Sequence, residues 1–537
     1  MKHSSKINKS YLVNCLIISI PVLLFLIGHG VGAYNSPDRY ATWFFNGESP
    51  YYMANARQYA DHGFQSLFYG NPFSYLKDPQ NIYFQFQTIT AGLVFYLTKI
   101  DPGVIWMVLG LVVSYLYIFY AQVFFGQIGL GRKGLLFITF LYFWGAGLHS
   151  LFGFFHEKLI LGGSLVDSIK AFEKFDIAEG WWMHSVGRNF IMPNYIYYHF
   201  LVMLSFIFIS SKRYTKLYVT LFVLSFSHPF VGLQLIISVC IWTLYESLYL
   251  KKVTLKEIKP YAPILLLGLH LGYYMIFLRT SSEHVLQEAQ WHTSITKLYE
   301  NWAFLAKNFI PSYAIVWAIF FYTIRTPKHF FNLFSSPINR FLGVFGVTNF
   351  LLANNEFAIN PIQPIHFTHG MVWIPFFLLG RDTLIDIYHF LSRKKYGVVL
   401  VFIIAFLYSF DNFTWMAKKG IQTFRGESQA ELNLKTKEYE VINFLNKNLK
   451  KSILTFPATN SLAYQICVYT PHRAFASHVS ITPEFSKRKN IQDEVVRTGE
   501  VPIEYMENEI AIISRNKIPN FKEVFSNEKY FIYLKRK

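Results

Sequence analysis

The chain has 537 residues, of which 53% are hydrophobic and 15% are charged. A soluble protein of this length would carry more charge, and apolar runs about as long as a bilayer is thick recur along the sequence, so the composition excludes an ordinary soluble enzyme. The net charge of +18 does not predict nucleic acid as a partner, because the basic residues form short clusters between apolar runs, as positive-inside topology requires. Three cysteines, two of them in apolar runs, predict neither a disulfide framework nor a cysteine metal cluster.

The first apolar run, residues 11–33, is predicted to be a signal-anchor span with the lysines before it on the cytoplasmic side. A long first external loop, residues 34–101, follows it. Within this loop residues 83–97 are apolar but short and include two glutamines, so we expect an interfacial or re-entrant segment. Every later basic cluster then falls on the cytoplasmic side.

About eleven transmembrane helices are predicted for an α-helical, polytopic membrane domain, residues 1–417, whose N-terminus is cytoplasmic. The run 217–250 fits two short spans that turn at His228-Pro229. The topology predicts a multi-pass protein of a cell membrane, and the absence of a eukaryotic targeting signal favours a bacterial inner membrane. After the first, the expected spans are residues 104–125, 135–155, 191–210, two within 217–250, 261–278, 309–324, one ending near residue 354, 367–379 and 398–410.

The last part of the chain, residues 418–537, differs in composition from the rest. It is charged, and helical and strand-like patterns alternate along it. We therefore expect a small α/β domain on the extracytoplasmic side. An amphipathic helix is expected at residues 438–449, and strands are expected at residues 452–456, 510–513 and 530–534.

One stretch of the first external loop, residues 46–63 (NGESPYYMANARQYADHG), reads as a short helix. Ser49 suits the N-cap, Pro50 the first helical position and Gly63 the exit. Glu48 precedes this helix, whose N-terminus favours an ionised carboxylate. From position alone, a solvated loop acid beside an interfacial aromatic helix is the simpler interpretation.

This motif resembles the first external loop of the GT-C glycosyltransferases, a superfamily that includes oligosaccharyltransferase catalytic subunits and protein O-mannosyltransferases. The shared features are Gly, an acid and two tyrosines, followed by a helix with an Ala-Arg pair and a His-Gly end. The order of loops and the external C-terminal domain match that architecture too. The resemblance implies a GT-C-like fold and a catalytic or metal-binding carboxylate, usually Asp. Here the position holds Glu48, and Asp38 is a second candidate in the same loop.

Further polar residues of the external loops could bind the phosphate or the sugar of a substrate. Arg57 is the nearest cation to Glu48, although an arginine here could equally snorkel to lipid headgroups. The resemblance implies a second acid from the loop 156–190, where Glu157 is the candidate, and Arg188 could bind a phosphate. An amphipathic surface helix is the alternative for that loop. The rival acids there are Asp167, Asp176 and Glu179.

Histidines mark two more places at the outer ends of the predicted spans. His228 interrupts an apolar run, and an ionisable group at such a place usually faces a cavity, although a turn residue bonded to the backbone is as good an interpretation. The segment NPIQPIHFTHG carries Gln363, His366 and His369. Two histidines alone do not make a metal site, so we expect these side chains to bind substrate or phosphate.

The favoured hypothesis is an integral-membrane glycosyltransferase that takes a sugar from a polyprenyl-phosphate carrier on the outer face. The acceptor, a glycan, a lipid or a protein, is left open, and so is a divalent metal cofactor. Membrane lipids are the other expected partners. The alternatives are a transporter or flippase for a lipid-linked or polyanionic glycan, and a GT-C-fold protein without activity. Charges are rare in the predicted spans and gather in the external loops, which favours the enzyme.

Overall fold

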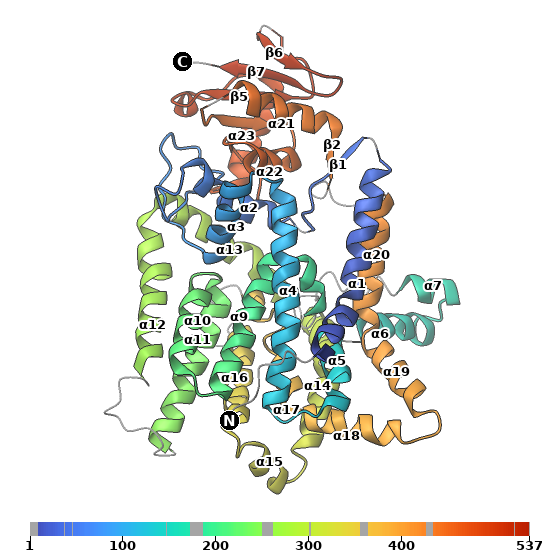
Figure 1. The fold of residues 1–537 in the computed structure, drawn as a ribbon. Helices are drawn as coiled ribbons and strands as arrows, with labels where there is room; N and C mark the ends of the chain where they lie inside the picture. The colour runs from blue at the N-terminus through green and yellow to red at the C-terminus, as the bar shows by residue number, and fades with distance from the viewer. Residues whose placement is uncertain are drawn as a thin grey trace.

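The structure is a computed structural model, and helices dominate the parts of the chain that it describes (Figure 1). The described residues are 9–36, 38–45, 47–145, 148–171, 186–249, 261–299, 302–354, 364–425, 433–449, 451–519 and 521–535. All statements below concern these residues.

Five helical segments in the described part are long and apolar enough to cross a membrane. Two bent pairs, α5 (Arg132–Trp144) with α6 (His149–Phe155) and α19 (Gly397–Tyr408) with α20 (Phe410–Arg425), would raise this number to seven if each is one span. The chain is thus a helical, multi-pass membrane protein, while eleven spans remain a prediction. The five segments are α1 (Lys9–Tyr34), α4 (Pro102–Gln127), α9 (Pro193–Ser210), α11 (Pro229–Leu244) with η4 (Tyr245–Tyr249), and α12 (Ala262–Leu271) with η6 (Gly272–Phe277) and η7 (Leu278–Thr280).

Shorter helices complete the bundle. Residues 217–250 hold most of α10 and all of α11, and the chain turns between these helices at residues 226–228, next to the predicted His228-Pro229 turn. Only α11 with its continuation is long and apolar enough to span, so two spans in this run stay a prediction. The backbone N–H of Phe86, the first residue of α3 (Phe86–Thr98), donates to the Phe226 carbonyl at 3.3 Å, which ties this turn to α3. The other helical elements described are η1 (His156–Ile160), α7 (Leu165–Lys170), η3 (Gly187–Ile191), α10 (Tyr214–Ser225), α13 (Ser282–Tyr299), α14 (Trp302–Thr323), α15 (Pro327–Leu333), α16 (Pro337–Ala353), η9 (Pro364–Phe367), α17 (Trp373–Leu379) and α18 (Arg381–Ser392).

Three predicted spans are not single straight helices. Residues 135–155 divide at Gly145, where α5 ends and α6 leaves at an angle of 69°. Residues 398–410 form α19, which then bends by 61° into α20. In residues 367–379 only the second half is the helix α17, because a tight turn precedes it. At the first and third breaks, backbone groups bond side chains from distant parts of the chain, and the spacing of apolar residues carries no information on such bonds.

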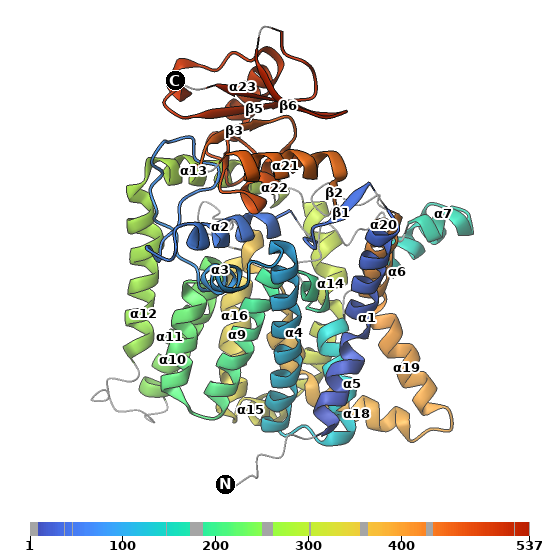
Figure 2. The same ribbon diagram turned by 45° about the horizontal axis from the view of Figure 1, so that its top comes forward.

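Two short helices, α2 (Ser49–Asp61) and α3 (Phe86–Thr98), lie across one end of the bundle (Figure 2). The apolar run predicted as interfacial is α3, which is too short to span. Its Gly92 allows a close approach to α2, since an added Cβ would lie 2.5 Å from the Ala56 carbonyl oxygen. The pair therefore forms a rigid platform at this end of the membrane domain.

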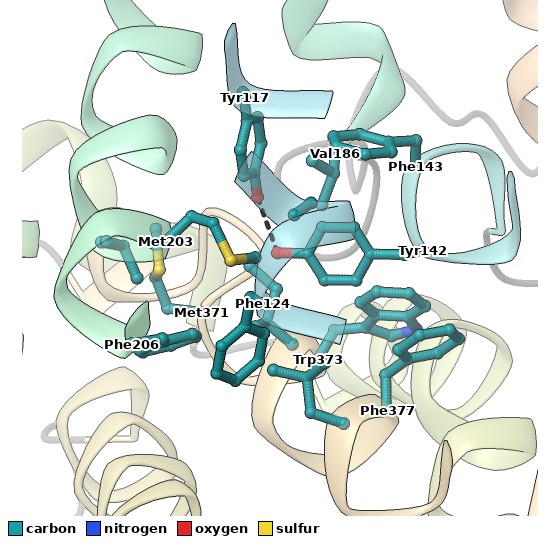
Figure 3. Packing of buried hydrophobic residues seen from close by; sticks show 14 of the residues in the cluster. Tyr117, Phe124, Tyr142, Phe143, Val186, Met203, Phe206, Met371, Trp373 and Phe377 are labelled. Atoms are coloured by element: carbon teal, nitrogen blue, oxygen red, sulfur yellow. Dashed lines mark hydrogen bonds between the residues drawn. The ribbon is translucent and has the colours of Figure 1, made fainter. Parts of the chain in front are cut away.

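Aromatic side chains fill the centre of the bundle (Figure 3). The hydroxyls of Tyr117 on α4 and Tyr142 on α5 are hydrogen-bonded at 2.6 Å. Trp373 and Phe377 of α17 stack with a centroid distance of 4.6 Å beside them. Because these large side chains are fully buried, their packing fixes how the helices sit around one another.

The C-terminal α/β domain begins later than expected. Residues 418–425 still belong to α20, which packs along α1 (Figure 1). The predicted amphipathic helix and three strands are confirmed as α21 (Thr436–Asn448), β3, β5 and β7. The sheet order is β4-β3-β5-β7-β6, with β3 parallel to β4 and β5, and β7 antiparallel to β5 and β6. The other elements are β3 (Leu454–Pro457), α22 (Asn460–Tyr469), β4 (Arg473–Ala474), α23 (Phe485–Thr498), η10 (Ile503–Tyr505), β5 (Ile510–Ser514), β6 (Glu523–Ser526) and β7 (Phe531–Lys535).

This domain holds the segment between α1 and α4 by many contacts. Strand β1 (Arg39–Ala41) pairs antiparallel with β2 (Asn433–Lys435). The Arg488 guanidinium donates to the Phe73 carbonyl at 2.6 Å, and the Asn508 amide donates to the Tyr75 carbonyl at 2.9 Å. Helix α2 therefore lies between the membrane helices and the α/β domain, held from both sides.

Candidate functional site

Glu48 is itself the N-cap residue of α2. The expected cap, Ser49, is instead the first helical residue, and Pro50 lies in the first turn. The Glu48 side chain does not cap its own helix. It turns to α9, where one carboxylate oxygen accepts the Tyr195 hydroxyl at 3.0 Å and the Asn194 amide at 3.3 Å. The carboxylate is thus fixed between two helices that are far apart in the sequence.

The surroundings of Glu48 change its protonation. Burial raises the pKa of Glu48 above its ordinary value, and the hydrogen bonds from Tyr195 and Asn194 oppose this rise because they favour the ionised form. Tyr52, one turn into α2, has a pKa raised by burial and further by the charge of Glu48. A carboxylate with a raised pKa binds a proton more readily than an ordinary carboxylate.

Three of the predicted histidines lie together next to Tyr195. The Tyr195 and His369 rings have centroids 5.2 Å apart, and His369 lies 5.8 Å from His228 and 5.4 Å from His366 by the same measure. These residues come from α9, from the turn before α17, from the start of α11 and from η9. The structure therefore brings Glu48 and these three histidines into one site through Tyr195.

The three histidines are neutral hydrogen-bonding groups. Burial lowers the pKa of His366 to about 4, and it lowers the pKa values of His228 and His369 well below 6.5, with further lowering from neighbouring histidines. His228 Nδ1 accepts the Val231 N–H at 3.2 Å and caps α11. His369 Nε2 and His366 Nδ1 lie 3.3 Å apart and can form a hydrogen bond in which either ring donates. These three histidines therefore offer a ligand hydrogen bonds without a positive charge of their own.

His369 has an unusual backbone. Its φ is +30°, and the φ of Gly370, which follows, is +78°. These two residues form the middle of a turn closed by a hydrogen bond from Met371 N–H to the Thr368 carbonyl. A non-glycine residue in such a conformation costs on the order of 1–3 kcal/mol and persists only where the surroundings hold it. Strain of this kind at a buried histidine is typical of functional sites.

Three residues of this site were not anticipated. Asn194, Tyr195 and Tyr198 belong to the run PNYIYYHF, which was interpreted only as the start of a span. The Tyr198 hydroxyl is buried and has no hydrogen-bond partner among the described residues, while its ring lies 4.5 Å from that of His228. A signal was available, since polar side chains in the first two turns of an apolar span indicate a cavity.

Two other predicted residues of the first loop lie on contacts to the α/β domain. Asp38 is exposed, and its carbonyl accepts the Thr436 N–H at 3.0 Å beside the β1–β2 pair. The Arg57 guanidinium donates to the Asp61 carboxylate at 3.0 Å and to the Val468 carbonyl of α22 at 3.2 Å. These positions link the loop to the domain, and no contact described here joins them to Glu48.

The remaining predicted residues are spread over the molecule. Glu157 lies in η1, partly exposed beside α7, which projects from the side of the bundle (Figure 1). Arg188 is fully buried in η3, where it donates to Asn412 and to the Asp411 carbonyl. Gln363 lies outside the described residues. Substrate binding by these three residues stays a prediction.

The α/β domain also reaches α2 close to Glu48. The His478 ring lies 6.2 Å from that of Tyr51 and 5.8 Å from that of Tyr464, measured between centroids. Burial lowers the pKa of His478 to about 4. Among the residues that the structure describes, no three His, Cys, Asp or Glu side chains cluster where they could hold a metal ion.

No family model matches the chain, and a search of curated proteins finds no significant match. The fold and the site together define a helical, multi-pass membrane protein with a buried carboxylate beside a histidine–tyrosine cluster. The likeness to GT-C glycosyltransferases remains a prediction from the first-loop motif.

Proposed function

We propose that the chain is an integral-membrane glycosyltransferase that moves a sugar from a polyprenyl-phosphate carrier to a glycan, lipid or protein acceptor at the outer face of the membrane. The observation that carries the proposal is the placement of Glu48. Its carboxylate has a raised pKa, is oriented by Tyr195 and Asn194, and adjoins neutral histidines at the end of the bundle that faces the α/β domain.

In this proposal Glu48 acts as the general base. An acceptor hydroxyl attacks the anomeric carbon of the donor sugar while its proton passes to Glu48. The bond between the anomeric carbon and the phosphate oxygen breaks, and polyprenyl phosphate leaves with the electron pair. Hydrogen bonds from the Tyr198 hydroxyl and from His366 or His369 would stabilise the departing phosphate. A divalent ion at the phosphate is an alternative in which Glu48 would be one of several ligands.

A transporter or flippase for a lipid-linked glycan is the second candidate, and a GT-C-like protein without activity is the third. A transporter would carry its polar groups near the middle of several spans. Here Glu48 and His228 lie at helix N-termini and His366 lies in the short helix η9, rather than in the middle of spans, which supports the enzyme.

The test is the release of polyprenyl phosphate from a panel of lipid-linked sugars by purified protein in lipid. Glu48→Gln should lower turnover by roughly 10²-fold or more, because the base is lost while the shape is kept. Glu283→Gln is the matched control. Glu283 is a buried carboxylate that accepts the Ser74 hydroxyl at 2.9 Å, away from the site.

Full turnover in folded Glu48→Gln would contradict the assignment of the base. Glu157→Gln and Asp38→Asn would then be tested in the same assay. If wild type releases nothing from any donor but moves lipid-linked sugars between leaflets of a vesicle, the transporter replaces the enzyme.

A further inference from the structure

Arg188 occupies a buried polar cluster some distance from the candidate site. Its Nε donates to Asn412 Oδ1 at 2.6 Å, and its Nη2 donates to the Asp411 carbonyl at 3.0 Å. The guanidinium carbon lies 5.2 Å from the centre of the Trp415 ring. All three partners belong to α20. The arginine therefore anchors the short helix η3 to α20.

The same two residues of α20 also hold the break between α5 and α6. The two carboxylate oxygens of Asp411 accept the backbone N–H groups of His149 and Ser150, each at 2.9 Å, and so cap α6. Asn412 Nδ2 donates to the Trp144 carbonyl at 2.7 Å and so closes the end of α5. We call Arg188, Asp411 and Asn412 the helix-break node. It fixes backbone groups that a helix break would otherwise leave unpaired.

From this node the chain leads directly to the candidate site. Helix η3 ends at Ile191, and α9 begins at Pro193, so that Asn194 and Tyr195 lie in its first turn. A second bond joins the two helices, since Asn189 Nδ2 and His199 Nε2 are 3.0 Å apart. Because Arg188 holds the start of η3, the first turn of α9 is fixed in place relative to α2.

We infer that Arg188 is a positioning residue, which anchors η3 to α20 and thereby holds Asn194 and Tyr195 against the Glu48 carboxylate. Without the anchor, η3 can shift and both donors lose their alignment with Glu48. Hydrogen bonds to a carboxylate favour its ionised form, so their loss makes Glu48 harder to ionise. The importance of this for catalysis rests on the proposed function, but the arrangement can be tested without turnover.

The test follows the protonation of Glu48 directly. A hydrophobic carbodiimide modifies protonated carboxyl groups, and mass spectrometry measures the modified fraction of the Glu48 peptide in full-length protein in lipid. The midpoint of the pH profile reports the pKa of Glu48. The titratable side chains of the described residues that interact electrostatically with Glu48 are Tyr52 of α2 and Tyr195 and Tyr198 of α9. As phenols they stay neutral across the profile.

Arg188→Gln should move the midpoint upward by about one pH unit, the size expected for a lost hydrogen bond to a charged group. Arg381→Gln is the matched control, with no shift expected. Arg381 is also buried, with Nη1 donating to Asn339 Oδ1 at 3.1 Å and to the Leu378 carbonyl at 2.7 Å. It lies on α18, at the opposite end of the bundle from α2 (Figure 1).

Adding Arg188→Gln to a double variant tests whether the effect of Arg188 passes through Asn194 and Tyr195. In a background with Asn194→Ala and Tyr195→Phe, Arg188→Gln should add no further shift, because the bonds it maintains are already gone. An unchanged midpoint in Arg188→Gln, an equal shift in Arg381→Gln, or a full further shift in the double background would each overturn the inference. If Arg188→Gln does not fold, Arg188→Lys takes its place. A lysine cannot reproduce both bonds, so an upward shift is again expected and no shift overturns the inference.

Discussion

The helix-break node and the candidate site are both buried polar clusters, but their polar groups have different hydrogen-bond partners. In the node, the Asp411 carboxylate accepts two backbone N–H groups, and the Arg188 guanidinium donates to two groups of α20. In the site, Glu48 has only neutral donors, and the buried Tyr198 hydroxyl has no partner among the described residues. A buried polar group is expensive unless it is bonded. The bonds of the node go to backbone groups at a helix break, so the node is structural, whereas we propose that the site is arranged for a ligand.

The largest effect is expected at the node. Asp411→Ala removes the charged acceptor of both N–H groups at the start of α6, which should cost about 3–5 kcal/mol in stability. The measurement is the unfolding temperature of purified protein. Asp382→Ala, at a side chain that is 63% exposed, is the control and should have little effect. A normal unfolding temperature for Asp411→Ala would break the contrast between the two clusters.

A smaller effect is expected at Tyr195. Tyr195→Phe removes one donor to the Glu48 carboxylate, so the pKa of Glu48 should rise by about one unit while the fold is kept. A base must be ionised to act, so the acid side of the pH profile of turnover should move upward by the same amount. A profile that moves downward, or not at all, would contradict the role of this hydroxyl.

His369→Asn should leave stability unchanged or raise it by about 1 kcal/mol, since asparagine tolerates a positive φ better than histidine. Substrate-dependent activity should fall at the same time. His366→Asn is the control, because the backbone of His366 is not in the left-handed region and has no strain to relieve. A large loss of stability in His369→Asn would show that this histidine stabilises the fold, as the helix-break node does.

The smallest effect is expected at Arg57. Its ion pair with Asp61 is partly exposed, with side-chain exposures of 12% and 28%, so Arg57→Gln should cost less than about 1 kcal/mol. Turnover should stay close to that of wild type if Arg57 only joins α2 to α22. A loss of turnover comparable with that of Glu48→Gln, without a change in KM for the acceptor, would instead support contact with the donor phosphate.

Apolar length and turn chemistry predicted most of the framework. The first spans, the short helix α3, the turn at His228 and three strands of the α/β domain follow from local sequence. The breaks at Gly145 and before Trp373 do not. The break at Gly145 is tolerated because Asp411 and Asn412, more than two hundred residues later, bind the freed backbone groups. At the break before Trp373, the side chains of Gln234 and Asn349 bind the Phe367 and Met371 carbonyls.

The candidate site shows the same limit. Glu48 and the histidines could be named from residue type and position, because ionisable groups beside apolar runs are few. Their convergence, and the identity of Tyr195 as the residue that joins them, depend on how α9 packs against α2. The one-residue error at the cap has the same origin, since Glu48 is drawn away from its own helix by donors on α9.

The most direct test of the central claim compares two values for one group. If Glu48 is the general base, its protonation is measured in two ways. In wild type, the pKa from carbodiimide modification of Glu48 should agree with the pKa on the acid side of the pH profile of kcat/KM. Both values should rise together in Tyr195→Phe. Values that differ by more than a unit, or that move apart in the variant, would show that another group takes the proton.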